Sequence, residues 1–533
     1  MSIDPKKLKK RFETAHRHKE QWRTIYEEAY RFMLPHRNQY DGYGDSDVPG
    51  QDKTDPVFDS TAQMSLQRLA NRIQSGLFPP QRNWCRLIAG NQIPRDAKPI
   101  LQESLDVYTD VLFDTMKQSQ FDLAMGEFLL DLCIGTAVMM IQKGDDDTQP
   151  IKFTPISPFQ IAFEEGPHGT VENVYRKQRR PFENVAREWP DAEIPKSMKD
   201  SYRERPTELV DLCESIYYDS SKKLFCYYVT DKTFENVLVY DELKNSPYIV
   251  SRWLKVAGER YGRGPALSVL GDTKTLNKVT ELTLKGASLS IGGVFTARDD
   301  GVLNPSTISI VPGAIIPVAS NASGGAGPSL SPLPRSGDAQ MSQIVSADMR
   351  MAIKKGLYDE SLPPDTMSAR SATEVAERMK ELSQNLGSAF GRLISETMIP
   401  IVRQTLTIMD EQGLIQMPLK VNGLQVQVRP QSPLAMAQNM EKLNELQTFV
   451  AMAQGLGPQG AQMLPMILNM ERAADYAADL IGIPQSIRTS PQERAEMVQQ
   501  AQAVMQNVQQ AQQNVTVPSD EQVNAAMDGG TMQ

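Results

Sequence analysis

Residues 371 to 401 read SATEVAERMKELSQNLGSAFGRLISETMIPI, and this stretch decides the fold. Ser371 and Glu374 have the spacing of a capping box, in which the serine and the glutamate each satisfy an orphan backbone amide at a helix start. The residues that follow place an apolar stripe at helical spacing: Val375, Met379, Leu382, Leu386, Phe390, Leu393 and Ile401. The pattern predicts one helix of about 40 residues, roughly 60 Å long, that is kinked at Pro400.

Two further helices are expected upstream, with a long excursion between them. The first begins at Gly264-Pro265, where proline suits a first helical turn, and runs to about Ile291. The excursion, Gly292 to Pro334, is rich in glycine and proline and predicts a β insertion dominated by loops. The second helix spans Asp338 to Lys355, with Gly356 as the expected C-terminal stop. A loop, Leu357 to Arg370, then leads into the long helix.

The N-terminal half predicts helices followed by strands. Helices are expected over residues 5 to 34, from Asp59 or Ser60 to Leu77, over Lys98 to Met116 and over Asp122 to Cys133. Between Gly135 and Val256 the pattern changes to short runs rich in β-branched and aromatic residues. These runs are Val138 to Ile141, Gln160 to Phe163, Val171 to Lys177, Glu208 to Tyr217, Leu224 to Thr230, Val237 to Tyr240 and Tyr248 to Leu254. The fold class is therefore α+β, mainly helical.

The C-terminal part predicts a hairpin-like link and more helix. Val421 to Val428 surround Asn422-Gly423, a dipeptide that is typical of tight hairpin turns. Residues 436 to 483 then read as broken helix. The Gln- and Ala-rich segment from Pro491 to Val515 fits either a coiled coil between copies or a disordered tail.

Length and composition bound the class of protein. A chain of 533 residues exceeds a single hydrophobic core, so several substructures are expected. The net charge of −9 argues against wrapping nucleic acid, although it is compatible with a channel through which DNA must slide. The longest apolar run, Phe128 to Ile141, is too short to cross a membrane. The four cysteines form no Cys-x-x-Cys pair and indicate a reduced, intracellular setting.

The sequence lacks the motifs of common enzymes. It contains no phosphate-binding loop of the Gly-x-x-x-x-Gly-Lys-Ser/Thr type, and none of its four histidines stands in a His-Glu-x-x-His pattern. Gly286-Ala-Ser-Leu-Ser lacks the final glycine of a nucleophile elbow and lies in a predicted helix. We therefore expect no enzymatic activity, no cofactor and no metal.

The order of elements and four local motifs resemble the portal proteins, or head-to-tail connectors, of short-tailed bacteriophages. The motifs are Leu77-Phe-Pro-Pro80 with Trp84, then Glu259-Arg-Tyr-Gly-Arg-Gly-Pro-Ala, Met367-Ser-Ala-Arg-Ser-Ala-Thr-Glu-Val-Ala-Glu-Arg and Glu396-Thr-Met-Ile-Pro-Ile-Val. In that order they are similar to the family's helix and Phe-Pro turn, the start of its first stem helix, its tunnel loop and the far end of its long helix. The resemblance covers roughly residues 10 to 485.

The resemblance implies a division of the chain into the family's parts. These are the wing (1–264), first stem helix (265–292), clip (293–335), second stem helix (336–357), tunnel loop (358–371), long helix returning to the wing (372–413), crown (414–490) and C-terminal tail or barrel (491–533).

The resemblance also implies a function. It predicts a twelve-fold ring at one capsid vertex of the virion, assembled in the host cytoplasm, through which double-stranded DNA is packaged and ejected. The implied partners are the terminase motor, the major capsid and scaffolding proteins and a tail adaptor, with no membrane. Residues expected to face DNA are Arg370, Lys354, Lys355, Asp359 and Glu360. Residues expected in the oligomer core are Val375, Met379, Leu382, Leu386, Phe390 and Leu393.

Two alternatives remain open from the sequence. The first is a phage morphogenesis enzyme, such as a peptidase or nuclease, which requires a nucleophile, acid–base pair or metal cluster. The second is a scaffolding or internal virion protein, which would lack the β-rich region and the helix, insertion, helix order.

Overall fold

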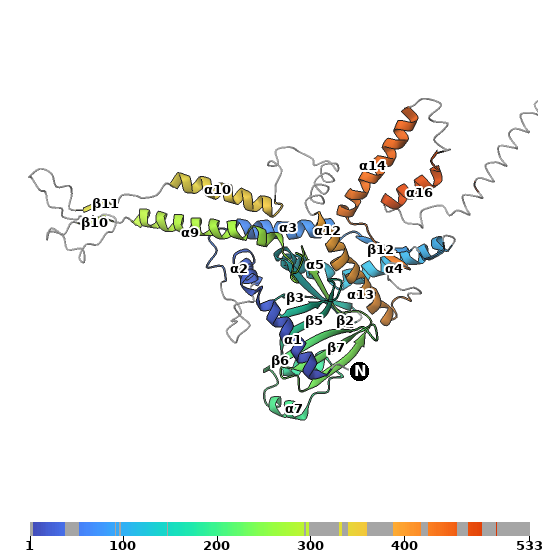
Figure 1. Ribbon diagram of the computed structural model, residues 1–533, viewed down its shortest axis with the longest axis horizontal. Coiled ribbons are helices and arrows are strands. Elements are labelled where there is room, and N and C mark those ends of the chain that lie inside the picture. Colours follow the sequence, from blue (N-terminus) through green and yellow to red (C-terminus); the bar gives the residue numbers. More distant parts are fainter. Residues whose placement is uncertain are drawn as a thin grey trace, which may run out of the picture. The chain divides into compact units, whose positions relative to one another are not determined.

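The computed structural model describes residues 4–37, 53–90, 92–94, 97–146, 148–292, 295–297, 330–332, 339–359, 387–416, 425–455, 467–481 and 497 (Figure 1). The chain divides into two compact units. The first comprises Met1–Trp84, Leu112–Met417 and Pro430–Gln438, and the second comprises Cys85–Val111, Pro418–Arg429 and Asn439–Gln533. Helices and strands are mixed, as the sequence predicts.

The N-terminal segment forms two helices where we predicted one. They are α1 (Pro5–Glu20) and α2 (Arg23–Met33), followed by the short η1 (Pro35–Arg37). The side chain of Asp4 accepts a hydrogen bond from the Lys6 amide and caps α1. The two helices pack on different parts of the unit, α1 on strand β4 and α2 on helices α3 and α8, so the chain bends between them.

Helix α1 packs on a five-stranded antiparallel sheet. Its order is β4-β5-β6-β7-β8, so each strand pairs with the next along the chain. The strands are β4 (Ile161–Glu165), β5 (Val171–Pro181), β6 (Leu209–Asp219), β7 (Leu224–Asp231) and β8 (Val237–Leu243). Two short helices that the sequence analysis did not predict, α6 (Phe182–Glu188) and α7 (Lys196–Tyr202), connect β5 to β6.

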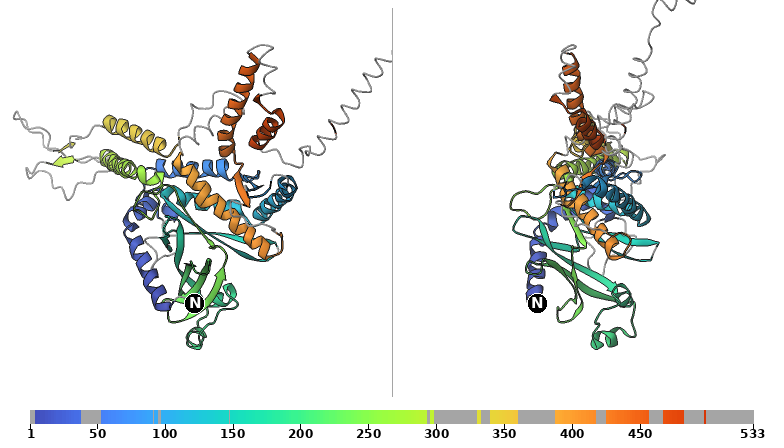
Figure 2. Two further views of the ribbon diagram at one scale, coloured as in Figure 1. Left: turned by 45° about the vertical axis from the view of Figure 1, so that its right-hand side comes forward. Right: turned by 90° about the vertical axis from the view of Figure 1, so that its right-hand side faces the viewer.

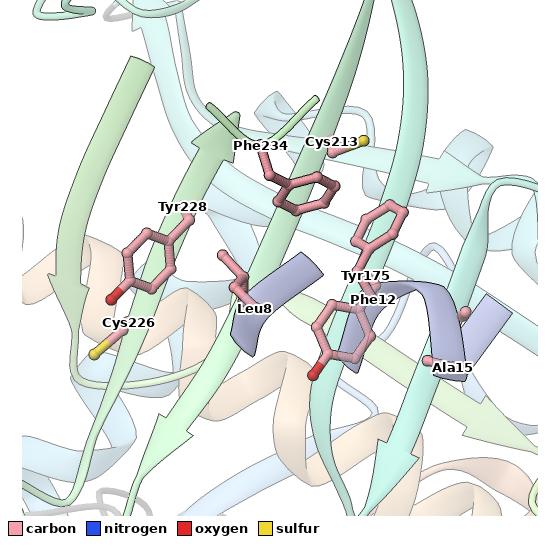
Figure 3. Packing of buried hydrophobic residues seen from close by; sticks show 9 residues of the cluster. Leu8, Phe12, Ala15, Tyr175, Cys213, Cys226, Tyr228 and Phe234 are labelled. Atoms are coloured by element: carbon pink, nitrogen blue, oxygen red, sulfur yellow. The ribbon is translucent and has the colours of Figure 1, made fainter. Parts of the chain in front are cut away.

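The core between α1 and this sheet is aromatic and closely packed (Figure 3). Leu8, Phe12 and Ala15 of α1 recur at helical spacing and are buried. The ring of Phe12 lies edge-on to Tyr175 at 5.7 Å and to Phe234 at 5.1 Å between centroids. These contacts fix the N-terminal helix on the β-rich part of the unit.

A second sheet has the order β3-β2-β9. It consists of β2 (Thr136–Asp146), β3 (Gln149–Ile156) and β9 (Tyr248–Arg252). Helix α5 (Phe121–Ile134) runs into β2 through Gly135, where a Cβ would lie 2.2 Å from the Gly262 carbonyl oxygen. Only glycine permits this approach, which brings the start of β2 against the segment that precedes the next helices.

Four further helices of the first unit pack against one another: α3, α8, α9 and α10. α3 spans Thr61–Leu77, α8 spans Pro265–Ser268, α9 spans Leu270–Gly292 and α10 spans Ala339–Gly356. The helix predicted from Gly264-Pro265 to about Ile291 is thus present, interrupted at Val269. α9 and α10 lie alongside each other in all views (Figures 1 and 2), and the short antiparallel pair β10 (Phe295–Ala297) and β11 (Leu330–Pro332) lies between them in sequence.

The predicted long helix is described only in its C-terminal part. It consists of α12 (Ser388–Arg392), a π-helical segment η2 (Leu393–Met398) and α13 (Ile399–Glu411). Just before Pro400, where a kink was predicted, the helix widens to the π form. The π segment lets the chain pass a residue that has no amide hydrogen to donate.

The hairpin predicted around Asn422-Gly423 is wrong, because its strand pairs with a distant strand in the second unit. β12 (Val426–Pro430) pairs with β1 (Cys85–Ala89), a strand that the sequence analysis missed. Helix α4 (Lys98–Gln118) covers β1, and Arg86 binds Asp106 of α4 with both donor–acceptor distances at 2.6 Å. The remaining helices are α14 (Pro433–Gly455) and α16 (Met470–Ile481).

None of the helices in the described part of the chain combines the length and the apolar character that a membrane crossing requires.

Candidate functional site

Helix α9 is buried near its N-terminal end and exposed further along the chain, where it pairs with α10. Near its start, α9 buries Thr273, Leu276 and Asn277. From Leu282 to Ser288 every side chain is exposed, although Thr283 shares a hydrogen bond of 2.7 Å with Ser342 of α10. Large apolar side chains are exposed on both helices: Leu282 (56%) and Leu284 (54%) on α9, and Ile344 (59%) and Met351 (62%) on α10. A single copy of the chain therefore leaves these apolar side chains in contact with water.

Charge is distributed unevenly along this pair. On α9, Lys274 binds Glu28 at 2.9 Å, while Lys278 and Lys285 both bind Glu281. On α10, Lys354 and Lys355 are exposed and have no ion-pair partner among the described residues. Within the described residues, the C-terminal end of α10 therefore carries positive charge without an ion-pair partner, and this charge complements the helix dipole.

Gly356 has a different role from the predicted C-terminal stop. It lies within α10, where a Cβ would come within 2.3 Å of the Val269 side chain. The left-handed residue that ends the helix is Tyr358, with φ of 54°. The amides of Tyr358 and Asp359 donate to the carbonyls of Lys355 and Lys354, which is the pattern of a Schellman motif. The helix thus ends at Gly356, one residue later than predicted.

Asp359, which we expected to face DNA, is buried with 2% of its surface exposed. Its carboxylate accepts hydrogen bonds from Ser65 Oγ at 2.9 Å and from Arg68 Nη1 at 3.1 Å, and lies 3.4 Å from Arg72 Nη2. All three partners belong to α3. The expectation for this residue is wrong because a carboxylate so enclosed and paired presents no charge to a channel.

Six of the predicted site residues lie outside the described residues. They are Glu360, Arg370, Val375, Met379, Leu382 and Leu386.

Phe390 and Leu393, predicted in the oligomer core, are buried within the subunit. They are 6% and 1% exposed, and the segment that contains Leu393 packs on strand β9. Among the described residues of the predicted apolar stripe, Phe390, Leu393 and Ile401 are all buried. For Phe390 and Leu393, however, the covering surface belongs to the same chain, so they leave no apolar surface for a neighbour.

The junction of η2 and β9 shows how Pro400 is accommodated. In an α-helix the amide of residue 400 would bond the carbonyl of Glu396, and proline has no such amide. Ser251 Oγ of β9 donates to that carbonyl at 3.0 Å and accepts from Thr397 Oγ1 at 2.8 Å. A strand side chain therefore satisfies the acceptor that the proline leaves open.

Arg252 is the central residue of this junction, and the sequence analysis did not single it out. Its side chain is fully buried and binds Glu396 at 2.7 Å, Glu165 of β4 and the Gly169 carbonyl at 2.9 Å. Burial lowers the pKa of the guanidinium, but the bonds to Glu396 and Glu165 outweigh burial and raise it. The local sequence around Arg252 does not indicate that its side chain is buried, because its partners Glu165 and Glu396 are distant in the chain.

The described residues form a mixed α and β fold with a pair of adjacent helices, α9 and α10. These residues contain no cluster of three side chains that could hold a metal ion. The family model for the bacteriophage head to tail connecting protein matches residues 5–488. The chain belongs to this family. It is a virion protein that connects the phage head to its tail, and the family is structural rather than enzymatic.

Individual relatives carry the name portal protein. The "Probable portal protein" of Bordetella phage BPP-1 is 24% identical over 87% of this chain and 85% of its own length. The "Portal protein" of Enterobacteria phage T3 is 20% identical over 67% of this chain and 66% of its own, and that of Escherichia phage T7 is 22% identical over 67% of each. A solved structure titled "Virion of native gene transfer agent (GTA) particle" has a TM-score of 0.34 and 12% identity, and covers 79% of this chain and 94% of that one.

Proposed function

We propose that copies of this chain form a closed ring in which the stem helices α9 and α10 line a channel for double-stranded DNA. The observation that supports this most directly is the exposed outer half of α9. A helix gains most of its stability from packing of an apolar face, and here Leu282 and Leu284 have no cover within the subunit. Neighbouring copies in a cyclic array supply that cover for every subunit at once.

The residues that we propose to face DNA are charged side chains at the end of α10 and in the tunnel loop. Lys354 and Lys355 at the end of α10, with Arg370 and Glu360 in the tunnel loop, face the DNA in this proposal, and Asp359 does not. A ring repeats each cation in every copy, so even a single weak contact becomes a collar of positive charge. Contacts with phosphate are weakened by salt, which suits a wall along which DNA must slide.

The remaining parts are assigned by the same proposal. The wing is residues 1–264, the clip 293–335, the tunnel loop 358–371, the long helix 372–413, the crown 414–490 and the C-terminal tail 491–533. The clip docks the terminase motor during packaging and the tail adaptor afterwards, while the outer parts meet the capsid and scaffolding proteins. The ring has twelve-fold symmetry in the virion.

Assembly is tested with charged substitutions on the stem. Leu282→Glu combined with Ile344→Glu places carboxylates where the proposal buries apolar surface. Leu209→Glu, at a residue that is 54% exposed in β6, is the matched control outside the stem. Electron microscopy of purified protein should show rings for the control and none for the stem variant. Intact rings in both proteins contradict the proposed interface.

The channel is tested with charge reversal. Lys354→Glu with Lys355→Glu, and separately Arg370→Glu, should leave rings intact and lower the nuclease-protected DNA in heads through repulsion of phosphates. Arg370→Ala should lower retention without slowing early packaging. Lys199→Glu on the exposed helix α7 is the control. Equal protected DNA in all proteins at several salt concentrations excludes these residues from the channel wall.

A further inference from the structure

Two ion pairs join α3 to α10 at matching intervals. Asp59, just before α3, binds Arg350 of α10 at 2.8 Å, and Arg68 of α3 binds Asp359, just after α10, at 3.1 Å. The two pairs are nine positions apart in both segments, so the segments run in the same direction. Nine helical residues span roughly 13 Å, and a slide of one turn, about 5.4 Å, separates both pairs. The charges thus specify one axial position of α10 on α3.

The carboxylate of Asp359 is more deeply buried than that of Asp59, with side chains 1% and 7% exposed. Besides the two arginines and Ser65 that surround the carboxylate, Arg72 Nη1 donates to the Tyr358 carbonyl at 2.5 Å. Tyr358 keeps a left-handed backbone, which is unfavourable for a residue with a Cβ. Strain of this kind persists where surrounding contacts impose it. The end of α10 is therefore held by α3 as well as by the backbone hydrogen bonds of its own Schellman motif.

Helix α3 is a rigid base for these contacts. Leu66, Leu69 and Ile73 on the adjacent face are fully buried, and the helix packs along α5. Ser65, Arg68 and Arg72 lie on one face at intervals of three and four residues. A displacement of Asp359 must either move this core helix or leave a buried carboxylate without its partners, and both are unfavourable.

We infer that Ser65, Arg68 and Arg72 are positioning residues for the DNA channel: they hold Asp359 and so fix the point at which the chain leaves the second stem helix. The inference rests on the proposed function, in which the residues after Asp359 approach DNA. Force that DNA exerts on the end of the stem is then borne by the core of the wing through α3. The exposed Lys354 and Lys355 lie in the same turn and are placed by the same contacts.

The test compares two buried aspartates in the full-length protein assembled into heads. Asp359→Asn removes the charge that Arg68 and Arg72 bind. Asp131→Asn is the matched control, because Asp131 is also 2% exposed and binds Arg37 of η1 and Tyr30 of α2, away from α10. Asp359→Glu keeps the carboxylate and serves as the conservative variant. The readouts are hydrogen exchange of the backbone amides of residues 353–359 and the nuclease-protected DNA retained over time.

We expect Asp359→Asn to speed exchange at residues 353–359 by about tenfold or more, because local opening no longer breaks ion pairs, and to lower DNA retention. Asp131→Asn should change neither readout, and Asp359→Glu should restore part of both. Unchanged exchange in Asp359→Asn overturns the positioning role. Faster exchange with DNA retention equal to that of Asp131→Asn overturns the link to the channel, whereas the proposed function itself is judged separately by the stem variants.

Discussion

Replacing Gly356 by alanine tests how closely α10 packs on the start of the first stem helix. A Cβ at this position would lie 2.3 Å from Val269 Cγ1, whereas carbon atoms in contact are about 3.5–4.0 Å apart. Val269 is β-branched and cannot easily rotate away. Relief therefore requires a shift of α10, and overpacking of this kind costs about 1–3 kcal/mol.

The matched control is Gly271→Ala, because Gly271 lies in α9 and its Cβ would meet nothing within 4 Å. Alanine is favoured over glycine in a helix interior by about 1 kcal/mol, and at helix ends, where both glycines lie, the gain is at most this amount. Gly271→Ala should therefore raise the free energy of unfolding by up to about 1 kcal/mol, and Gly356→Ala should lie about 1–3 kcal/mol below it.

Urea unfolding followed by tryptophan fluorescence measures this difference. All four tryptophans belong to the first unit, as do both glycines, so the signal reports the unit that is perturbed. The linear dependence on urea gives the two free energies, and equal slopes confirm that the same surface is exposed. If Gly356→Ala unfolds at the same urea concentration as Gly271→Ala, or at a higher one, the close approach to Val269 is refuted.

Three further predictions concern buried polar groups. Ser251→Ala should lower the free energy of unfolding by about 1–3 kcal/mol, because the Glu396 carbonyl then has no donor, whereas the exposed Ser201→Ala changes urea unfolding little. The four thiols are free and buried, and burial raises their pKa, to about 12 for Cys213, so a thiol reagent should modify none in the folded protein and all four in denaturant. Burial raises the pKa of Asp59, but hydrogen bonds from Thr61 and Arg350 outweigh it and hold the pKa below its usual value. Its contribution to stability is therefore present at neutral pH and is lost as the pH falls through that lowered pKa, and acid unfolding of Asp59→Asn should lack this component.

Local sequence determined the elements and their order. The Gly-Pro start of the first stem helix, the glycine- and proline-rich excursion and the apolar stripe of the long helix are signals that act within a few residues. They suffice because helix caps, proline and periodicity limit the backbone before any distant contact forms. The order of these elements also carried the family resemblance, which the head to tail connecting protein match confirms over residues 5–488.

The pairing of strands could not be predicted from the local sequence. β3 was missed because Pro150 and Pro155 count against a strand, yet proline is tolerated in an edge strand, and β3 lies at the edge of its sheet. β12 was expected in a hairpin with its sequence neighbours, but its partner β1 lies more than three hundred residues earlier in the chain. Which strand supplies the ladder depends on how the whole chain folds.

Which charged residues are buried was determined only by the tertiary structure. By pattern, Asp359 is a loop carboxylate and Arg252 a strand cation, and both types are usually exposed. Asp359 is instead enclosed by Arg68 and Arg72, and Arg252 by Glu396 and Glu165. A buried charge is tolerated only where its counter-charge lies within a few ångströms, and those partners come from distant parts of the chain. The sequence contains the charges, but the packing of α3 and β9 determines which of them remain exposed at the stem.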